Sequence, residues 1–134
     1  INDPVIRQDI ARLHILAQSA SWTAQRARAA QKAGKPHGPE GSLGKLAASH
    51  IGRLASRVHT DISANEALLT GPESAMDGTI AEILVSTPAG SIAGGTDEIQ
   101  RNIIAERVLG LPKEPRFDTG PFRDVPRNSS AKDQ

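Results

Sequence analysis

Apolar residues in the first quarter of the chain recur at alternating steps of four and three residues. The seam consists of Ile6, Ile10, Leu13, Ala17, Ala20, Ala24 and Ala27. This spacing is typical of a helix with a narrow packing face, and it predicts one long helix over about residues 3–33. Asp3 suits the N-cap and Pro4 the first helical position. Gly34 and Pro36 then end the helix.

The rest of the chain also shows helical periodicity. A second long helix is expected over about residues 42–69, with the stripe Leu43, Ala47, Ile51, Leu54, Val58 and Ile62. Residues 76–86 fit a short helix or, because several are β-branched, a strand; two long neighbouring helices favour the helix. A last helix is expected over about residues 97–109, with an inner face formed by Ile99, Ile103, Ile104 and Val108. The predicted fold class is all-α and resembles a helical bundle.

The composition limits both the core and the chemistry. Aromatic residues make up 2% of the chain, so the core must be built from small aliphatic side chains that bury little area each. We therefore expect the chain to gain burial from partners. With a net charge of +1 and almost no aromatics, nucleic-acid binding is not expected. No apolar run is long enough for a membrane span. The absence of cysteine fits a cytoplasmic protein.

The four histidines do not form a metal-binding pattern. His50 and His59 are too far apart in sequence for a metal-ligand pair on one helix face, and no cysteine supports them. Serines are frequent, but none lies in a Gly-x-Ser-x-Gly turn. We expect no metal site.

A small-residue loop, residues 89–96, leads directly into the last helix. Gly94 and Gly95 permit close approach of a ligand or of another backbone segment, and Thr96 can cap the helix. The helix start then presents free N–H groups and the positive end of its dipole. Physical chemistry alone favours an ordinary tight connection followed by a cap, because Asp97 and Glu98 already place negative charge in the first turn.

The amino-acid sequence of this segment is more informative about protein family than its physical pattern is. The run Gly94-Gly-Thr-Asp-Glu-Ile-Gln-Arg-Asn-Ile-Ile-Ala-Glu-Arg-Val-Leu-Gly-Leu-Pro112 resembles the last helix of the acyl-CoA dehydrogenases, and a looser match extends back to about Asp3. The resemblance implies that residues 1–112 are the C-terminal helical domain without its first helix. Residues 113–134, which are polar and contain several prolines, are expected to be an extended or disordered tail.

The resemblance also implies roles for individual residues. Gly94 and Gly95 match substrate-binding positions, with Gly95 close to the thioester. Thr96 and Glu98 match positions that contact flavin adenine dinucleotide (FAD). Gly71 belongs to a segment that reaches the flavin of a neighbouring subunit in the family, although Ala67 and Thr70 depart from the usual pattern. Many members carry the catalytic Glu where this chain has Gly94. Branched-chain-type members instead carry the base on an earlier helix, so no catalytic residue is assigned.

The resemblance therefore implies a flavoenzyme that desaturates acyl-CoA thioesters and passes electrons to electron-transfer flavoprotein or a similar acceptor. As 134 residues, the chain is expected to be an inactive piece of a homo- or hetero-oligomeric enzyme. Two alternatives remain open. One is a non-catalytic helical association module that uses the alanine-rich seam. The other is a degenerate subunit that partners a catalytic homologue, which the glycine at position 94 suggests.

Overall fold

The computed structural model describes residues 2–36, 38–113, 116 and 120–125. Among these residues there are four α-helices and no strand. They are α1 (Pro4–Lys32), α2 (Glu40–Ser63), α3 (Thr79–Ser86) and α4 (Asp97–Arg107). Short 3₁₀ segments lie at Ala64–Leu68, Ala75–Gly78, Thr87–Ser91 and Phe122–Asp124. The all-α prediction is therefore confirmed.

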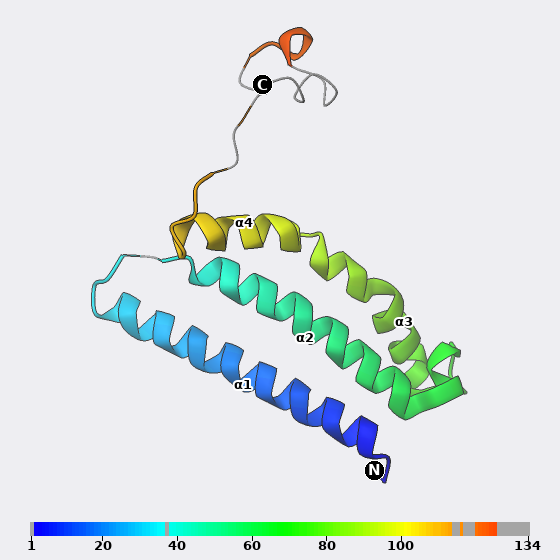
Figure 1. The fold of residues 1–134 in the computed structure, drawn as a ribbon. Coiled ribbons are helices and arrows are strands. Elements are labelled where there is room, and N and C mark those ends of the chain that lie inside the picture. Colours follow the sequence, from blue (N-terminus) through cyan, green and yellow to red (C-terminus); the bar gives the residue numbers. More distant parts are fainter. Residues whose placement is uncertain (1, 37, 114–115, 117–119, 126–134) are drawn as a thin grey trace.

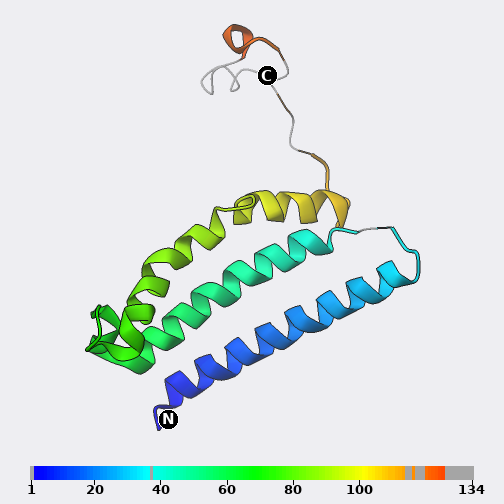
Figure 2. The ribbon, with the colours of Figure 1, turned by 180° about the vertical axis from the view of Figure 1, so that it is seen from behind.

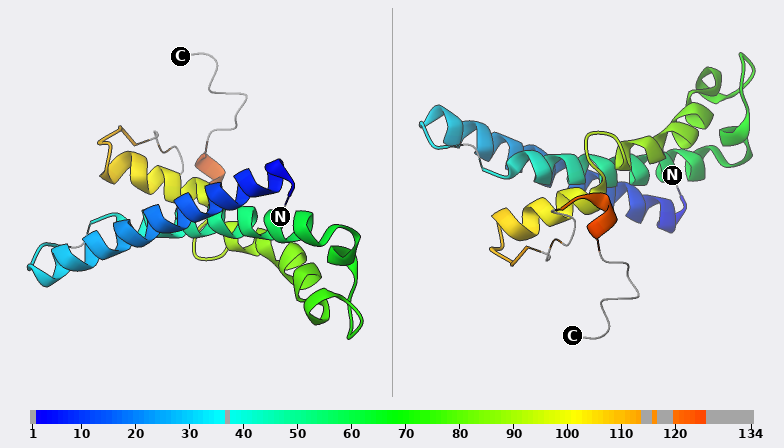
Figure 3. Two further views of the ribbon diagram at one scale, coloured as in Figure 1. Left: turned by 90° about the horizontal axis from the view of Figure 1, so that it is seen from below. Right: turned by 90° about the horizontal axis from the view of Figure 1, so that it is seen from above.

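Helix α2 is the centre of the fold. It packs against α1 on one side and against α3 and α4 on the other (Figures 1 and 2). Helices α1 and α2 run antiparallel, and α3 and α4 return along α2 in the opposite direction. Figure 3 shows the same order from below and above, with α1 crossing α2 at an angle. The arrangement is an open layer built around α2 rather than a closed bundle.

The predicted helix starts follow from local capping. The Asp3 carboxylate accepts hydrogen bonds from the backbone N–H groups of Val5 (2.7 Å) and Ile6 (3.1 Å), as expected for an N-cap. Thr96 caps α4 by accepting a bond from the Ile99 N–H at 3.3 Å. Gly110, just after α4, has a φ of +66°, which suits a residue that ends a helix.

Two predicted boundaries differ from the structure. Helix α2 ends at Ser63 rather than near position 69, because Ala64 adopts φ 49° and ψ −126° and so leaves the helical conformation. The segment expected as a helix over 76–86 is helical only from Thr79. Met76 and Asp77 before it both lie in the left-handed region, with φ of 52° and 54°.

The described chain buries few apolar side chains. Val58, Ala67 and Ile80 are buried, whereas polar or charged side chains are buried at Asp9, Ser49, Ser56, Ser74, Asp97 and Gln100. On α4, Ile103 and Ile104 are half-buried as expected, but Ile99 and Val108 are 49% and 47% exposed, so their predicted inward placement is wrong. The buried side chains of α4 are instead the polar Asp97, which bonds to α2, and Gln100.

Of the tail predicted as extended or disordered, Lys113, Arg116 and residues 120–125 are described, and Phe122–Asp124 form a single 3₁₀ turn. Residues 114–115, 117–119 and 126–134 lie outside the described part of the chain, so the division at residue 112 stays a prediction. No helix in the described residues combines the length and the apolar character needed to cross a membrane.

The burial pattern predicts which valine stabilises the layer. Val58 is 3% exposed and Val85 is 81% exposed. Val58→Ala should lower the free energy of unfolding by about 2 kcal/mol, through lost burial and the cavity left behind. Val85→Ala should change it by less than about 0.5 kcal/mol. Urea titration followed by circular dichroism measures both variants, and equal effects would contradict the burial assignment.

Candidate functional site

The loop over residues 89–96 begins within the 3₁₀ segment Thr87–Ser91 and leads to α4, alongside the first half of α2. It contains the paired glycines that the sequence singled out. Gly94 has a φ of +68° and Gly95 a φ of +90°, conformations that residues with a side chain rarely adopt. Nothing lies within 4 Å of where a Cβ on Gly94 would stand, so this side of the turn is open.

The other side of the turn is closed by Gln100. Its Nε2 donates a hydrogen bond to the Gly94 carbonyl oxygen at 3.1 Å, and its side chain is buried. A Cβ on Gly95 would lie 2.7 Å from that Nε2, which is closer than real contacts allow. The backbone conformation therefore favours glycine at position 95, and a side chain there would displace the Gln100 amide.

A polar cluster beneath the turn joins α4 to α2. Asp97, the first residue of α4, has a side chain only 6% exposed. Its Oδ2 accepts hydrogen bonds from Arg53 Nη1 and Ser49 Oγ, both at 2.9 Å. Lys45 Nζ lies 3.4 Å from its Oδ1. Lys45, Ser49 and Arg53 are spaced four residues apart, which places them on one face of α2. We call Lys45, Ser49, Arg53 and Asp97 the α2–α4 clamp.

The clamp also holds the start of the glycine loop. Lys45 Nζ donates to the Gly90 carbonyl oxygen at 2.8 Å. Ser91 Oγ lies 2.8 Å from Ser49 Oγ and also accepts a hydrogen bond from Arg53 Nη1. The same face of α2 thus fixes the chain on both sides of Gly94 and Gly95.

Charge in the first turn of α4 is strongly compensated. Burial alone would raise the pKa of Asp97, but the hydrogen bonds from Arg53, Ser49 and Lys45 outweigh it and lower that pKa from 3.8 to about 2. Glu98 is exposed. Bonds from its own backbone N–H and from the Thr96 hydroxyl lower its pKa as well. Both carboxylates are therefore ionised at neutral pH. The buried charge of Asp97 is balanced by Arg53 and Lys45, whereas the exposed Glu98 pairs with Arg101 at 3.4 Å.

The structure brings together four of the five predicted site residues. Gly94, Gly95, Thr96 and Glu98 form one continuous turn at the start of α4. Gly71 lies apart from them, beyond the far end of α2, between the 3₁₀ segments Ala64–Leu68 and Ala75–Gly78 (Figure 1). Its φ of +92° requires glycine, and no neighbour occupies the space a side chain would take. Within one copy of the chain the two parts form separate surfaces.

Sequence reasoning missed the clamp. Asp97 was interpreted as a partner of the helix dipole, whereas it is also the buried centre of an ion-pair cluster. The one sequence signal was the spacing of Lys45, Ser49 and Arg53, which places three donors on one helix face. The spacing alone does not say which acid they meet.

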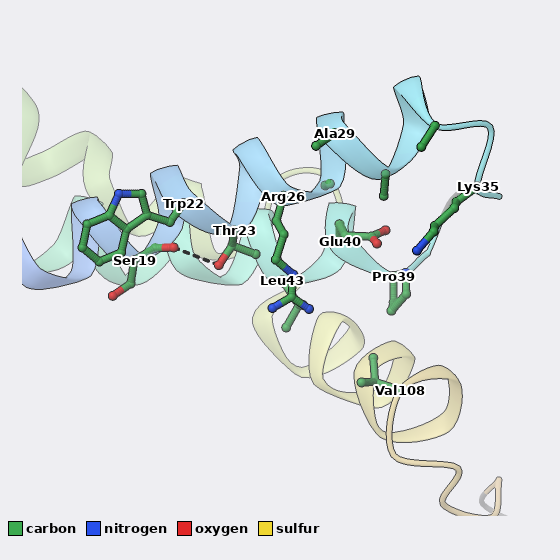
Figure 4. A pocket seen from close by; sticks show the side chains of 13 residues that line it. Ser19, Trp22, Thr23, Arg26, Ala29, Lys35, Pro39, Glu40, Leu43 and Val108 are labelled. Carbon is green, nitrogen blue, oxygen red and sulfur yellow. Dashed lines mark hydrogen bonds between the residues drawn. The ribbon is translucent and has the colours of Figure 1, made fainter.

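A separate cavity of about 960 Å³ lies between the end of α1, the start of α2 and the end of α4 (Figure 4). Trp22 and Arg26 from α1, Leu43 from α2 and Val108 after α4 all line it. It contains none of the predicted site residues and neither histidine nor cysteine. Within the described part of the chain, no three His, Cys, Asp or Glu side chains are grouped so that they could hold a metal ion.

The fold and the glycine turn define a class of protein. Residues 1–109 match the family model described as "Acyl-CoA dehydrogenase, C-terminal domain", so the chain belongs to the acyl-CoA dehydrogenase family. The resemblance noted from the sequence is thereby confirmed.

Individual relatives agree with this family. The chain is 33% identical over 119 residues to acyl-CoA dehydrogenase IpdE1 of Mycobacterium tuberculosis, which covers 84% of the chain and 28% of that protein. A 26-residue stretch is 77% identical to acyl-CoA dehydrogenase IpdE1 of Mycolicibacterium smegmatis, covering 19% of the chain and 7% of that protein. The chain therefore spans under a third of the length of the curated relatives it matches.

Solved structures share the fold. The ChsE4-ChsE5 complex from Mycobacterium tuberculosis matches with a TM-score of 0.72 at 23% identity, covering 84% of this chain and 30% of that one. A structure titled "Tcur3481-Tcur3483 steroid ACAD" matches with a TM-score of 0.73 at 19% identity, with the same coverage. Both titles name two components.

Substitution of Gly94 and of Gly95 should lower the free energy of unfolding by different amounts. Gly94→Ala should lower the free energy of unfolding by about 1 kcal/mol, because the backbone is left-handed but the space is open. Gly95→Ala should cost about 2 kcal/mol, because it also displaces the Gln100 amide from its partly buried hydrogen bond to Gly94. Urea denaturation measures both, and a smaller loss for Gly95→Ala than for Gly94→Ala would contradict this geometry.

The lowered pKa of Asp97 predicts an acid-dependent stability. Its folded pKa of about 2 lies below the ordinary value of 3.8. The stabilisation is therefore complete above pH 3.8 and is lost as the pH falls toward 2. Asp97→Asn removes this titration, so the variant should be less stable at neutral pH and should lose less stability over the acid range. Thermal unfolding across that range tests this; parallel curves for wild type and variant would contradict it.

Proposed function

We propose that this chain is the C-terminal part of a flavin-dependent acyl-CoA dehydrogenase that desaturates the α,β bond of an acyl-CoA thioester. The observation that carries the proposal is the open Gly94–Gly95 turn in front of the capped start of α4. Family membership supports the same reaction class. Because the chain spans 28% of the M. tuberculosis relative, the complete site needs residues beyond those described.

The turn fits one edge of a flavin site. Gly94 leaves open space where a side chain would stand, and Gly95 lets the backbone bend there. Thr96 and Glu98 are the residues that would contact FAD. Because Glu98 is ionised and exposed at the helix start, this edge favours an uncharged portion of the cofactor over its phosphates. When bound, FAD supplies the acceptor for the hydride that leaves the β-carbon.

The chain's own residues contribute positioning rather than proton transfer. Gly94 has no acidic group, and the described loop from Ala89 to Gly95 contains no carboxylate. The base that removes the α-proton is therefore proposed to lie outside this turn. Gly94 and Gly95 would allow the thioester to approach the backbone closely, while Gln100 and the clamp hold the turn in shape. Gly71 would meet the flavin of a neighbouring subunit.

Oligomeric assembly is part of the proposal. The layer leaves large apolar side chains exposed, among them Trp22 (64%), Leu68 (71%) and Val85 (81%). Exposed apolar surface of this kind suits packing against further protein. The two-component titles of the structural neighbours support a complex of related subunits. Electrons would leave through electron-transfer flavoprotein or a similar acceptor.

A second candidate is a degenerate subunit that supports a catalytic homologue. The glycine at position 94, where many family members carry the base, favours it. In that case the chain would complete a partner's flavin site and carry out no chemistry of its own. A subunit whose own flavin site is complete would turn over substrate without the homologue.

The gene product that contains these residues, purified with any subunits that accompany it, tests the function. It should contain bound flavin by absorbance and should reduce an artificial electron acceptor with an acyl-CoA. Straight-chain, branched and steroid acyl-CoAs should be compared, since one structural neighbour is titled a steroid enzyme. A product without flavin and without turnover would overturn the proposal.

The 134-residue chain alone should be colourless and inactive, because the described residues provide one edge of the site. Light scattering with and without added flavin separates the alternatives. Assembly that depends on flavin supports the enzyme, whereas dimers that form without flavin support a non-catalytic association module. Stoichiometric bound flavin and turnover in the 134-residue chain would contradict the prediction that it is inactive alone.

A further inference from the structure

Of the polar contacts in the described layer, those around the glycine turn are the most concentrated. Asp97 and Ser49 are 4% and 6% exposed, and they meet Lys45 and Arg53 through a continuous set of charge-assisted hydrogen bonds. Such bonds are shorter and stronger than neutral ones and fix geometry more tightly. A second buried acid, Asp9, lies elsewhere in the described chain.

Asp9 lies on α1 and, like Asp97, has a buried carboxylate. It is 3% exposed, and it pairs with Arg12 at 2.9 Å and with Arg57 of α2 at 3.6 Å. Both acids are thus buried on a helix that packs against α2, and both meet basic side chains. They differ in what they hold. Asp9 joins the regular parts of two helices, whereas the partners of Asp97 also bind the loop at Gly90 and Ser91.

We infer that Lys45, Arg53 and Asp97 are positioning residues that hold the Gly94–Gly95 turn in the open shape that receives the flavin and the thioester. The inference rests on the proposed function for what the turn receives, but the clamp's action on the turn stands on geometry alone. Gly90 and Ser91 are fixed on one side of the glycines and Asp97 on the other. The glycines between them have the least intrinsic preference for one conformation, so the contacts at both ends define the turn together with the Gln100 bond to Gly94.

The arrangement also explains why two cations meet one acid. Lys45 reaches both the Gly90 carbonyl oxygen and Asp97, and Arg53 reaches both Ser91 and Asp97. Each cation therefore bridges the two ends of the loop. Loss of Asp97 would leave Lys45 and Arg53 without their shared charged acceptor and would release the α4 end of the loop from α2, while Gly90 and Ser91 keep their own bonds. The turn would then sample shapes in which Gly94 no longer faces open space.

Asp97→Asn and Asp9→Asn are the matched pair that tests this role. Both remove a buried, ion-paired carboxylate, and both should lower the melting temperature. Hydrogen–deuterium exchange in the 134-residue chain reads the turn without any flavin. Amides of residues 90–96 should exchange at least tenfold faster in Asp97→Asn and should stay near the wild-type rate in Asp9→Asn. Equal protection of the turn in the two variants would overturn the inference.

The second readout is flavin affinity in the complete gene product. Asp97→Asn should raise the dissociation constant for FAD about tenfold or more, whereas Asp9→Asn should leave it within about twofold of wild type at a temperature where both are folded. Arg53→Lys, which keeps the charge, should recover part of the affinity that Arg53→Met loses. Unchanged affinity in Asp97→Asn, with wild type binding FAD normally, would overturn the positioning role. Failure of wild type to bind FAD would count against the proposed function instead, while the exchange experiment would still judge the clamp.

Discussion

The ion pairs between Asp97 and the donors on α2 are the contacts on which the arrangement of this chain depends. Removing a carboxylate from water is unfavourable, and a buried ion pair is tolerated only where hydrogen bonds satisfy the charge. Asp97 meets that condition through Arg53, Ser49 and Lys45. The bonds are directional, so they favour the register in which α4 packs on α2. Few apolar side chains are buried to set that register otherwise.

Local features of the fold could be predicted from the sequence, because their causes lie within a few residues. Asp3 and Thr96 begin helices by accepting bonds from N–H groups two or three residues ahead. The alternating apolar spacing was enough to identify α1. The end of α2 was missed because Ala64 carries no recognised stop signal, yet its φ is positive. Alanine rarely adopts a positive φ, so residue type did not predict this conformation.

The residues of the candidate site also fall into those that the sequence predicted and those that it did not. Gly94, Gly95 and Thr96 were found because they are neighbours in the sequence and their conformations follow from residue type. The α2–α4 clamp was not found, because it joins positions more than forty residues apart, such as Lys45 and Asp97. Periodicity shows that Lys45, Ser49 and Arg53 share a face. Only the path of the chain brings an acid to that face.

The wrong prediction for Ile99 and Val108 has a physical meaning. An apolar pattern reflects all the surface a residue covers in the assembled protein, whereas exposure here counts only the described chain. Helix α4 bonds to α2 through Asp97, buries Gln100 against the glycine turn and leaves Ile99 half in solvent. An isoleucine side chain that is exposed to water contributes little hydrophobic stabilisation. Ile99 would be buried if a large planar ligand or another subunit covered the glycine turn. The discrepancy thus supports the same conclusion as the absence of a carboxylate at position 94. Under the proposed function, this surface would provide shape and an apolar edge, and the base that removes the proton would come from residues outside the turn.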